Sequence, residues 1–289
     1  MKVLVTGASG FTGTYVVSAL RRQGVAVRAF LRPGGNPDVL RPAEIELASG
    51  DLDNPGSLQA ALSGVDALVN IASLGFGHAP GIVGAAENAG IRRALFISST
   101  SIFTRLESRS QAVRLQAEEI IGRSGLAWTI LRPTMIYGSA RDRNMCRLIR
   151  YLRRWPLIPV FGSRAGLQQP VYVGDVALAV SRALTSAATI GKAYNIPGKQ
   201  ALTLDQIIDV IARRLGRRIR KVHLPGAPVA ALLSLMEKAY PGLPIKAEQI
   251  RRLDEDKSFD YSDASRDFDY RPRSFEEGIA LELAGMDLI

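Results

Sequence analysis

The sequence contains very little cysteine and histidine. Among its 289 residues there is one cysteine, Cys146, and there are two histidines, His78 and His223. A single cysteine excludes an intramolecular disulfide and fits a reducing compartment, so we expect a cytoplasmic protein. Zinc sites use several cysteine and histidine ligands, whereas these two histidines lie far apart in the chain. We therefore expect no metal site.

Long apolar runs are also absent. No run reaches the ~20 residues that a helix needs to cross a bilayer, so we expect no transmembrane segment. The chain begins with a short apolar stretch rather than with the pattern of a secretory leader. With 47% hydrophobic residues, the composition is that of a globular protein. A chain of this length forms one large core or two small ones.

Acidic residues are in the minority. Lysine and arginine number 37, and aspartate and glutamate 27, which gives a net charge of +10 at neutral pH. This excess favours an anionic partner, but it does not choose between a phosphorylated ligand, a nucleic acid and an acidic membrane surface. No aromatic stacking platform or groove-reading motif supports nucleic acid. We therefore expect an anionic small-molecule substrate and no nucleic acid, and contact with a membrane surface stays open.

A glycine-rich turn lies close to the start of the chain. Residues 3–6 are typical of a short buried strand, and Gly7, Gly10 and Gly13 follow with a G-x-x-G-x-x-G spacing before a helical pattern. We expect Gly7 to allow a tight turn and Gly13 to allow close packing of the helix. Gly10 lets a pyrophosphate approach the backbone, where the first N–H groups of the helix can bind it. The pattern predicts a dinucleotide site.

Strands and helices alternate after this turn. Strand patterns occur at 25–31, 45–47, 67–72, 94–97 and 128–131, and helical patterns at 58–62, 80–90 and 110–123. This alternation predicts an α/β fold with a parallel, doubly wound sheet. Ligands in such sheets bind at the carboxyl ends of the strands.

Two residues at expected strand ends bear on the choice of cofactor. Arg32 follows the strand 25–31, where a dinucleotide fold holds the adenosine ribose. An acidic residue there would bond the ribose hydroxyls, whereas an arginine suits a 2′-phosphate. We therefore favour NADP(H), with NAD(H) as the alternative. Asp51 follows the strand 45–47, and its carboxylate could reach the adenine amino group.

The second half of the chain is less regular. Residues 147–155 are typical of an amphipathic helix with an arginine-rich face. Three interpretations stay open: a core-packed helix with a solvated face, contact with an anionic substrate or cofactor, and a helix on a membrane or nucleic acid. Asp175 is a candidate N-cap after the strand that precedes it, and Thr203 is a candidate cap for a helix over 203–215. A further apolar helix is expected over 229–240.

The order and spacing of six motifs resemble an extended short-chain dehydrogenase/reductase. The motifs are Thr6–Gly13, Gly50–Leu52, Ser98–Thr100, Leu131–Pro133 with Ile136–Gly138, Val171–Ala177 and Tyr270–Gly278. The resemblance implies a Rossmann domain mainly in residues 1–138. It also implies a small substrate-capping region mainly in 139–289, with 165–200 partly returning to the Rossmann domain. The cofactor bed that it implies comprises Gly7, Ser9, Gly10, Phe11, Thr12, Gly13, Arg32, Asp51, Leu52, Ala72, Ser98 and Pro133.

The sequence departs from this family at the catalytic pair. The family has Tyr-x-x-x-Lys, in which the tyrosine is the general acid/base and the lysine lowers its pKa and holds the nicotinamide ribose. Counting back from Glu118 places Ser110 at the tyrosine position and Arg114 at the lysine position. Serine is too weak an acid to replace a phenol, whereas an arginine can still bond a ribose. Thr100 matches the family's Ser/Thr partner, so one catalytic hydroxyl is retained.

This departure leaves two functions open. The first is an NADP(H)-dependent oxidoreductase or sugar-nucleotide epimerase-like enzyme with a degenerate site, in which Arg143, Arg147 or the arginines of 213–218 hold an anionic substrate. The second is a non-catalytic dinucleotide-binding sensor, assembly factor or accessory subunit. The intact glycine turn and the lost Tyr/Lys pair favour the second, whereas Thr100 and the complete capping segment favour the first. The pattern resembles NmrA-like redox sensors and the accessory subunit of respiratory complex I, and residues 132–144 resemble the latter especially. The sequence predicts no particular oligomeric state.

Overall fold

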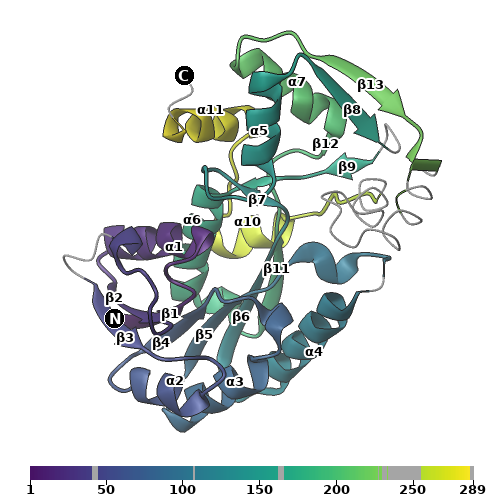
Figure 1. The fold of residues 1–289 in the computed structure, drawn as a ribbon. Coiled ribbons are helices and arrows are strands. Elements are labelled where there is room, and N and C mark those ends of the chain that lie inside the picture. The colour runs from purple at the N-terminus through teal and green to yellow at the C-terminus, as the bar shows by residue number, and fades with distance from the viewer. Residues whose placement is uncertain are drawn as a thin grey trace. The chain divides into compact units, whose positions relative to one another are not determined.

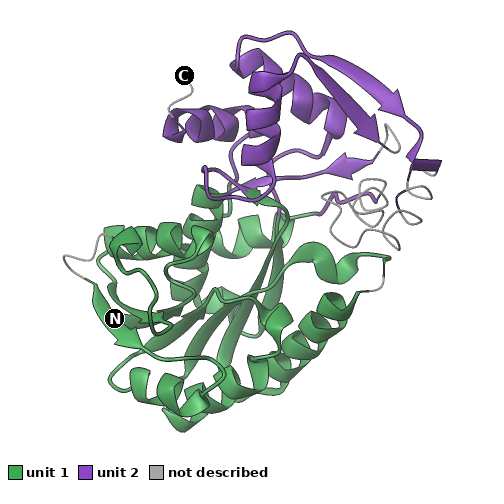
Figure 2. Ribbon diagram, viewed as in Figure 1, with its two compact units in different colours: residues 1–136, 173–196, 260–271 green, residues 137–172, 197–259, 272–289 purple. Residues whose placement is uncertain are grey.

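The computed structural model divides the chain into two compact units (Figure 2). Unit 1 comprises Met1–Ile136, Val173–Ile196 and Asp260–Arg271, and unit 2 comprises Tyr137–Tyr172, Pro197–Phe259 and Pro272–Ile289. The structure describes residues 1–40, 45–106, 108–161, 166–226, 228–229, 233 and 255–286. Apart from Val229 and Leu233, the helix expected over 229–240 lies outside the described residues.

Unit 1 is built on a seven-stranded sheet with the order β11-β6-β5-β4-β1-β2-β3. All neighbouring strands in it are parallel. The strands are β1 (Lys2–Thr6), β2 (Ala26–Leu31), β3 (Glu46–Ser49), β4 (Ala67–Asn70), β5 (Arg93–Ile97), β6 (Ala127–Pro133) and β11 (Lys192–Ile196). This topology confirms the expected doubly wound parallel sheet, and it gives every strand its carboxyl end at the same edge.

Helices cover both faces of this sheet (Figure 1). On one face α1 (Phe11–Arg22) packs against α6 (Val173–Thr185), and on the other α2 (Pro55–Ala61), α3 (Ala79–Asn88) and α4 (Arg109–Arg123) lie side by side. Strand side chains alternate between the faces, so Leu4 and Leu68 pack with Leu58, Ile82 and Ile121 of the second layer. A short helix, α10 (Ser262–Phe268), contacts β11 and α6.

The expected role of Asp175 is wrong. Helix α6 begins at Val173, so Asp175 is the third residue of its first turn and not its N-cap. The chain passes from β10 (Val171–Tyr172) into the helix without an intervening residue. Asp175 is nevertheless 4% exposed, and its negative charge is one cause, after burial, of the raised pKa of Tyr270. An acidic residue in the first turn suits the helix dipole without capping it.

Arg93 joins β5 to the later segments of unit 1. Its guanidinium donates to the Ala127 carbonyl at 2.7 Å, the Leu184 carbonyl at 3.0 Å, and the hydroxyls of Thr129 at 2.9 Å and Thr189 at 3.0 Å. All of these acceptors are neutral, and no carboxylate pairs with Arg93 among the described residues. Burial lowers the pKa of Arg93 to about 10, so it stays charged at neutral pH.

Unit 2 combines three two-stranded sheets with three described helices. Strand β13 (Arg220–Leu224) runs parallel to β8 (Leu157–Phe161), β12 (Leu202–Thr203) is antiparallel to β9 (Leu167–Gln168), and β10 pairs with β7 (Ile136–Tyr137). Helix α7 (Leu204–Arg214) contacts both α5 (Met145–Arg154) and α11 (Phe275–Gly285). Thr203 caps α7 through a capping box with Gln206, which confirms the expected cap.

A buried carboxyl pair lies within unit 2. Glu282 of α11 is 0% exposed and Asp142 is 5% exposed. Neither Glu282 oxygen, nor Asp142 Oδ2, has a hydrogen-bond donor among the described residues. Burial and the neighbouring Asp142 carboxyl raise the pKa of Glu282 to about 9. A proton held between the two carboxyls supplies the donor that the side chains otherwise lack.

Candidate nucleotide-binding site

The turn between β1 and α1 fits tightly against the end of β4. Gly7 has a positive φ of 65°, and a Cβ on it would lie 2.8 Å from the Ala72 backbone nitrogen. Thr6 Oγ1 donates to Asn70 Oδ1 at 2.6 Å, and Asn70 Nδ2 donates to the Ala72 carbonyl at 3.0 Å. Thr6 and Asn70 are both fully buried. These bonds fix the turn on the loop that follows β4, and only glycine fits at position 7.

The first turn of α1 is open to an anion. Its N-cap, Gly10, is exposed and has extended backbone, and no side chain of the described residues caps the helix. The first backbone N–H groups of a helix have no acceptor within it, so those of α1 can meet a phosphate, as the helix dipole favours. Gly13 lies one turn further, where a Cβ would be 2.1 Å from the Gly7 carbonyl oxygen. The helix therefore packs directly on the turn that precedes it.

The residues expected at the adenosine end follow β2 and β3. Arg32 is exposed directly after β2, and its guanidinium has no ion pair among the described residues. Gly50 N donates to the Leu31 carbonyl at 2.9 Å, which joins the ends of the two strands. Asp51 Oδ1 accepts from Asp53 N at 3.1 Å, and Leu52 lies beside it in the same loop. This end of the site thus presents the Arg32 guanidinium and the Asp51 carboxylate.

All twelve residues expected in the cofactor bed lie at one edge of the sheet. They follow, or in one case end, six neighbouring strands: the glycine turn follows β1, Arg32 follows β2, Asp51 and Leu52 follow β3, Ala72 follows β4, Ser98 follows β5 and Pro133 ends β6. Neighbouring parallel strands bring their carboxyl ends together, which is where ligands of such sheets bind.

Two hydroxyl side chains lie near the ends of β5 and β6. Ser98 is 8% exposed, and its Oγ has no hydrogen-bond partner among the described residues. Thr100, also 8% exposed, donates through Oγ1 to the Pro133 carbonyl at 3.4 Å. An unpaired buried hydroxyl costs stability unless a ligand satisfies it. Ser98 Oγ is therefore a group with which a bound ligand can pair.

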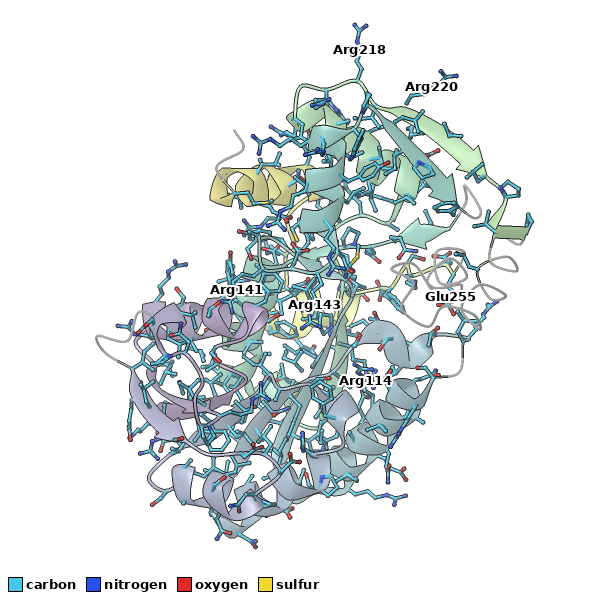
Figure 3. The ribbon with its side chains drawn as sticks, in the orientation of Figure 1. Arg114, Arg141, Arg143, Arg218, Arg220 and Glu255 are labelled. Atoms are coloured by element: carbon cyan, nitrogen blue, oxygen red, sulfur yellow. The ribbon has the colours of Figure 1, made fainter. Side chains whose placement is uncertain are left out.

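Ser110 and Arg114 both lie on the first turns of α4. Ser110 is exposed, and its Oγ is 3.3 Å from the Oγ of Ser108, the residue that caps the helix. Arg114 reaches from α4 to the loop after β4, where its Nη2 donates to Ser73 Oγ at 3.5 Å (Figure 3). A Cβ on Gly75 would be 2.9 Å from Arg114 Cζ. Arg114 thus places a cation at the carboxyl end of β4.

The position of α4 is set by an ion pair and by a glutamine that sequence reasoning missed. Arg132 Nε, near the end of β6, donates to Glu118 Oε2 at 3.0 Å. Gln111 Nε2 donates to the carbonyls of Ile102 at 3.0 Å and Thr104 at 2.8 Å. Gln111 directly follows Ser110, but nothing in the local pattern shows which carbonyls it meets.

Two exposed phenylalanines were also missed. Phe76 ends the 3-10 turn η2 (Leu74–Phe76) and is 75% exposed, and Phe103 ends η3 (Thr100–Phe103) and is 49% exposed. Both turns contact α4 and follow the carboxyl ends of β4 and β5. The Arg132 guanidinium lies 5.4 Å from the Phe103 ring centroid. The candidate site therefore has aromatic surface next to its polar groups.

Tyr137 does not take the place of the missing catalytic tyrosine. It is 1% exposed, and its Oη donates to the Phe275 carbonyl at 3.4 Å. A Cβ on Gly278 would lie 2.0 Å from the Tyr137 hydroxyl. Tyr137 thus packs inside unit 2 against Phe275 and Gly278 of the second motif.

Comparison with known proteins agrees with this geometry. Residues 7–148 match a family described as NAD(P)H-binding. An NAD(P)H azoreductase of Xenophilus azovorans is 27% identical over 229 residues, which cover 77% of this chain and 77% of that protein. Subunit 9 of the NADH dehydrogenase [ubiquinone] 1 alpha subcomplex, a mitochondrial protein of Arabidopsis thaliana, is 26% identical over 278 residues, covering 87% of this chain and 67% of that one.

Solved structures support the fold. The UDP-glucose 4-epimerase of Thermotoga maritima, with UDP-glucose, superposes with a TM-score of 0.78 at 17% identity and covers 99% of both chains. Residues 7–148 therefore form an NAD(P)H-binding domain with a Rossmann fold. The relatives of the chain are extended and atypical short-chain dehydrogenases/reductases. In the part of the chain that the structure describes, no helix is both long and apolar enough to cross a membrane.

Proposed function

We propose that the protein is an NADP(H)-dependent oxidoreductase that works without a tyrosine acid. The observation that carries this proposal is the arrangement on α4: Arg114 holds a cation against the loop after β4, while an exposed Ser110 stands where the phenol is expected. The arrangement keeps a group that can bind the cofactor and lacks the group that would donate a proton.

The residues present fit the cofactor. The uncapped N-terminus of α1 suits a pyrophosphate, and the unpaired Ser98 Oγ suits a polar group at the other end of the dinucleotide. Arg32 suits a 2′-phosphate, Asp51 the adenine, and Arg114 the second ribose. Each of these roles is part of the proposal.

The missing phenol limits the class of substrate that the protein can reduce. Bound NADPH would supply a hydride to an acceptor. Thr100 Oγ1 already donates to the Pro133 carbonyl, and a serine at position 110 is a far weaker acid than a phenol with a pKa of about 10. The acceptor is therefore one whose reduced form takes its proton from water, such as an azo compound or a quinone. The azoreductase relative and the exposed Phe76 and Phe103 support a flat aromatic acceptor of this kind.

Consumption of NADPH tests this function. We expect the protein to oxidise NADPH in the presence of an azo dye or a benzoquinone, and to leave UDP-glucose unchanged. Ser110→Ala should keep turnover within about twofold, because no proton passes through this hydroxyl, whereas Arg114→Ala should lower NADPH affinity about tenfold. A loss of turnover in Ser110→Ala would contradict the proposal. If the protein binds NADPH but oxidises it with none of the acceptors, the result would favour the second candidate below.

The choice of NADPH over NADH depends on Arg32. Replacing Arg32 with alanine is expected to weaken NADPH binding by about tenfold or more, because it removes a charge-assisted bond to the 2′-phosphate. NADH affinity should change less than about twofold, since NADH lacks that phosphate. Fluorescence titration measures both, and Arg22→Ala is a control for the loss of one exposed positive charge. Equal losses for the two cofactors would remove Arg32 from this role.

The second candidate is a dinucleotide-binding accessory protein or sensor. The absence of a phenol at position 110 favours it, as does the relative that is a subunit of NADH dehydrogenase. In this case the bound cofactor stabilises the fold and is not consumed. The substrate-capping role of residues 139–289, an anionic substrate held by their arginines, and a cytoplasmic location stay predictions.

A further inference from the structure

One end of unit 2 carries exposed apolar side chains among arginines. Trp155 is 52% exposed and Leu157 is 44% exposed. Figure 3 shows Arg218 and Arg220 of unit 2 extending away from the ribbon. We call this region the Trp155 surface. It comprises Arg153, Arg154, Trp155, Leu157, Arg217, Arg218 and Arg220.

Two segments far apart in the sequence form this surface. Helix α5 ends at Arg154, Trp155 follows as its C-cap, and β8 begins at Leu157. The connection from α7 to β13 lies against this corner, because the Arg217 guanidinium donates to the Arg153 carbonyl. Arg220 N also donates to the Pro156 carbonyl at 2.7 Å. Arg220 is the register partner of Leu157, so their side chains share one face of the β8–β13 pair.

The acidic residues of α7 do not neutralise these arginines. Asp209 pairs with Lys221 at 2.7 Å, and Asp205 pairs with His223 at 2.9 Å. Successive residues of a strand point to opposite faces, so Lys221 and His223 face α7 while Arg220 faces away from it. Among the described residues, none of the seven members of the Trp155 surface forms an ion pair with a carboxylate. The surface therefore keeps its full positive charge.

We propose that the Trp155 surface binds the headgroup region of an anionic lipid membrane. Exposing a tryptophan and a leucine side chain to water is unfavourable. Their transfer to the boundary between headgroups and acyl chains lowers the free energy. The Arg154 guanidinium lies 5.6 Å from the Trp155 ring centroid, so the cation and the ring can meet a lipid phosphate together. Guanidinium groups pair with phosphates through two parallel bonds.

A nucleic acid fits this surface less well. Binding of single strands uses several aromatic rings on which successive bases stack. Here one tryptophan lies beside an aliphatic leucine. A leucine side chain cannot stack with a base, but it can insert into a bilayer. Tyr151, 38% exposed on the preceding turn of α5, donates its hydroxyl to the Leu157 carbonyl at 3.1 Å and does not form a second platform. The combination of apolar and cationic side chains is typical of an interfacial membrane contact.

Vesicle flotation of the full chain tests the proposal. The probes are vesicles of phosphatidylcholine alone and of phosphatidylcholine with phosphatidylglycerol. We expect binding to the anionic vesicles only, weakened by added salt. Arg218→Glu with Arg220→Glu should lower the partition coefficient by about tenfold or more. Trp155→Ser with Leu157→Ser should lower it as well, and should remove most of the binding that persists at high salt.

The control is a charge-matched variant, Arg22→Glu with Arg92→Glu. Both residues are exposed in unit 1, Arg22 at the end of α1 and Arg92 directly before β5. The control should bind anionic vesicles within about twofold of the wild type, apart from the small effect of net charge. An equal loss in the control overturns the proposal, as does unchanged vesicle binding in both surface variants. Loss of binding to a single-stranded RNA, without loss of binding to vesicles, would assign the surface to nucleic acid instead. Unchanged NADPH titration and unchanged melting temperature show that each variant is folded.

Discussion

Gly13→Ala is expected to abolish NADPH binding and to destabilise unit 1. The new Cβ would lie 2.1 Å from the Gly7 carbonyl oxygen and 2.6 Å from that of Ala8. Both atoms belong to backbone, which is held by the buried Thr6–Asn70 bond, so neither can rotate away as a flexible side chain would. Helix α1 must move off the turn, and we expect a loss of about 3 kcal/mol or more in the free energy of unfolding.

Gly84→Ala is the matched control for this change. Gly84 lies inside α3, and a Cβ built on it meets no atom within 4 Å. The substitution should raise the free energy of unfolding by about 0.5–1 kcal/mol, because alanine is the better helix former. Thermal unfolding and an NADPH titration of both variants separate the two effects. If Gly13→Ala binds NADPH as the wild type does, the packing of α1 on the turn does not set the cofactor site.

The second large effect concerns Glu282 and pH. Its folded-state pKa of about 9 lies far above the value of 4.5 for an exposed glutamate. Between about pH 4.5 and about pH 9 the native state therefore keeps a proton that the unfolded state loses. The contribution of Glu282 to the free energy of unfolding is fully present below about pH 4.5 and is lost as the pH rises towards 9. One such proton changes the free energy of unfolding by up to ~1.4 kcal/mol per pH unit.

Glu282→Gln should remove this dependence. The amide N–H donates to the Asp142 carboxylate without a titrating proton. Urea unfolding at about pH 5 and about pH 8 gives the change in the free energy of unfolding between the two conditions. This free energy should fall less in the variant than in the wild type, by at least about 2 kcal/mol. Glu276→Gln on the same helix is the control, because the Glu276 side chain is 41% exposed and pairs with Arg214 on the surface. A wild-type slope that persists in Glu282→Gln would show that another group titrates.

The sequence predicted those parts of the site that depend on short-range pattern. The strand, the glycine turn and the first turn of α1 are adjacent in the chain, and the spacing of Gly7, Gly10 and Gly13 follows from that local geometry. The strand ends bearing Arg32 and Asp51 could be placed for the same reason. Contacts of these residues with a cofactor stay predictions.

Features that depend on distant segments could not be predicted in this way. Strand β11 is short and mixes Lys192, Tyr194 and Asn195, so it has no apolar run, and its place is set by pairing with β6. The stacking of Arg114 on Gly75 joins two segments about forty residues apart, and local periodicity carries no information on it. The sequence showed an arginine-rich helix at 147–155, but not the second segment that completes the Trp155 surface.

The hydrogen bonds of Arg93 have a consequence for synthesis on the ribosome. Arg93 and Ala127 emerge early, whereas the acceptors at Leu184 and Thr189 follow many residues later. Until then the Arg93 guanidinium lacks its acceptors at Leu184 and Thr189. Strand β6 also lacks its neighbour β11. Residues 1–138 therefore form no finished domain when they leave the ribosome. The seventh strand of the sheet can pair with β6 only after about residue 196, the end of β11, has been synthesised, and α10 of the same unit follows later still.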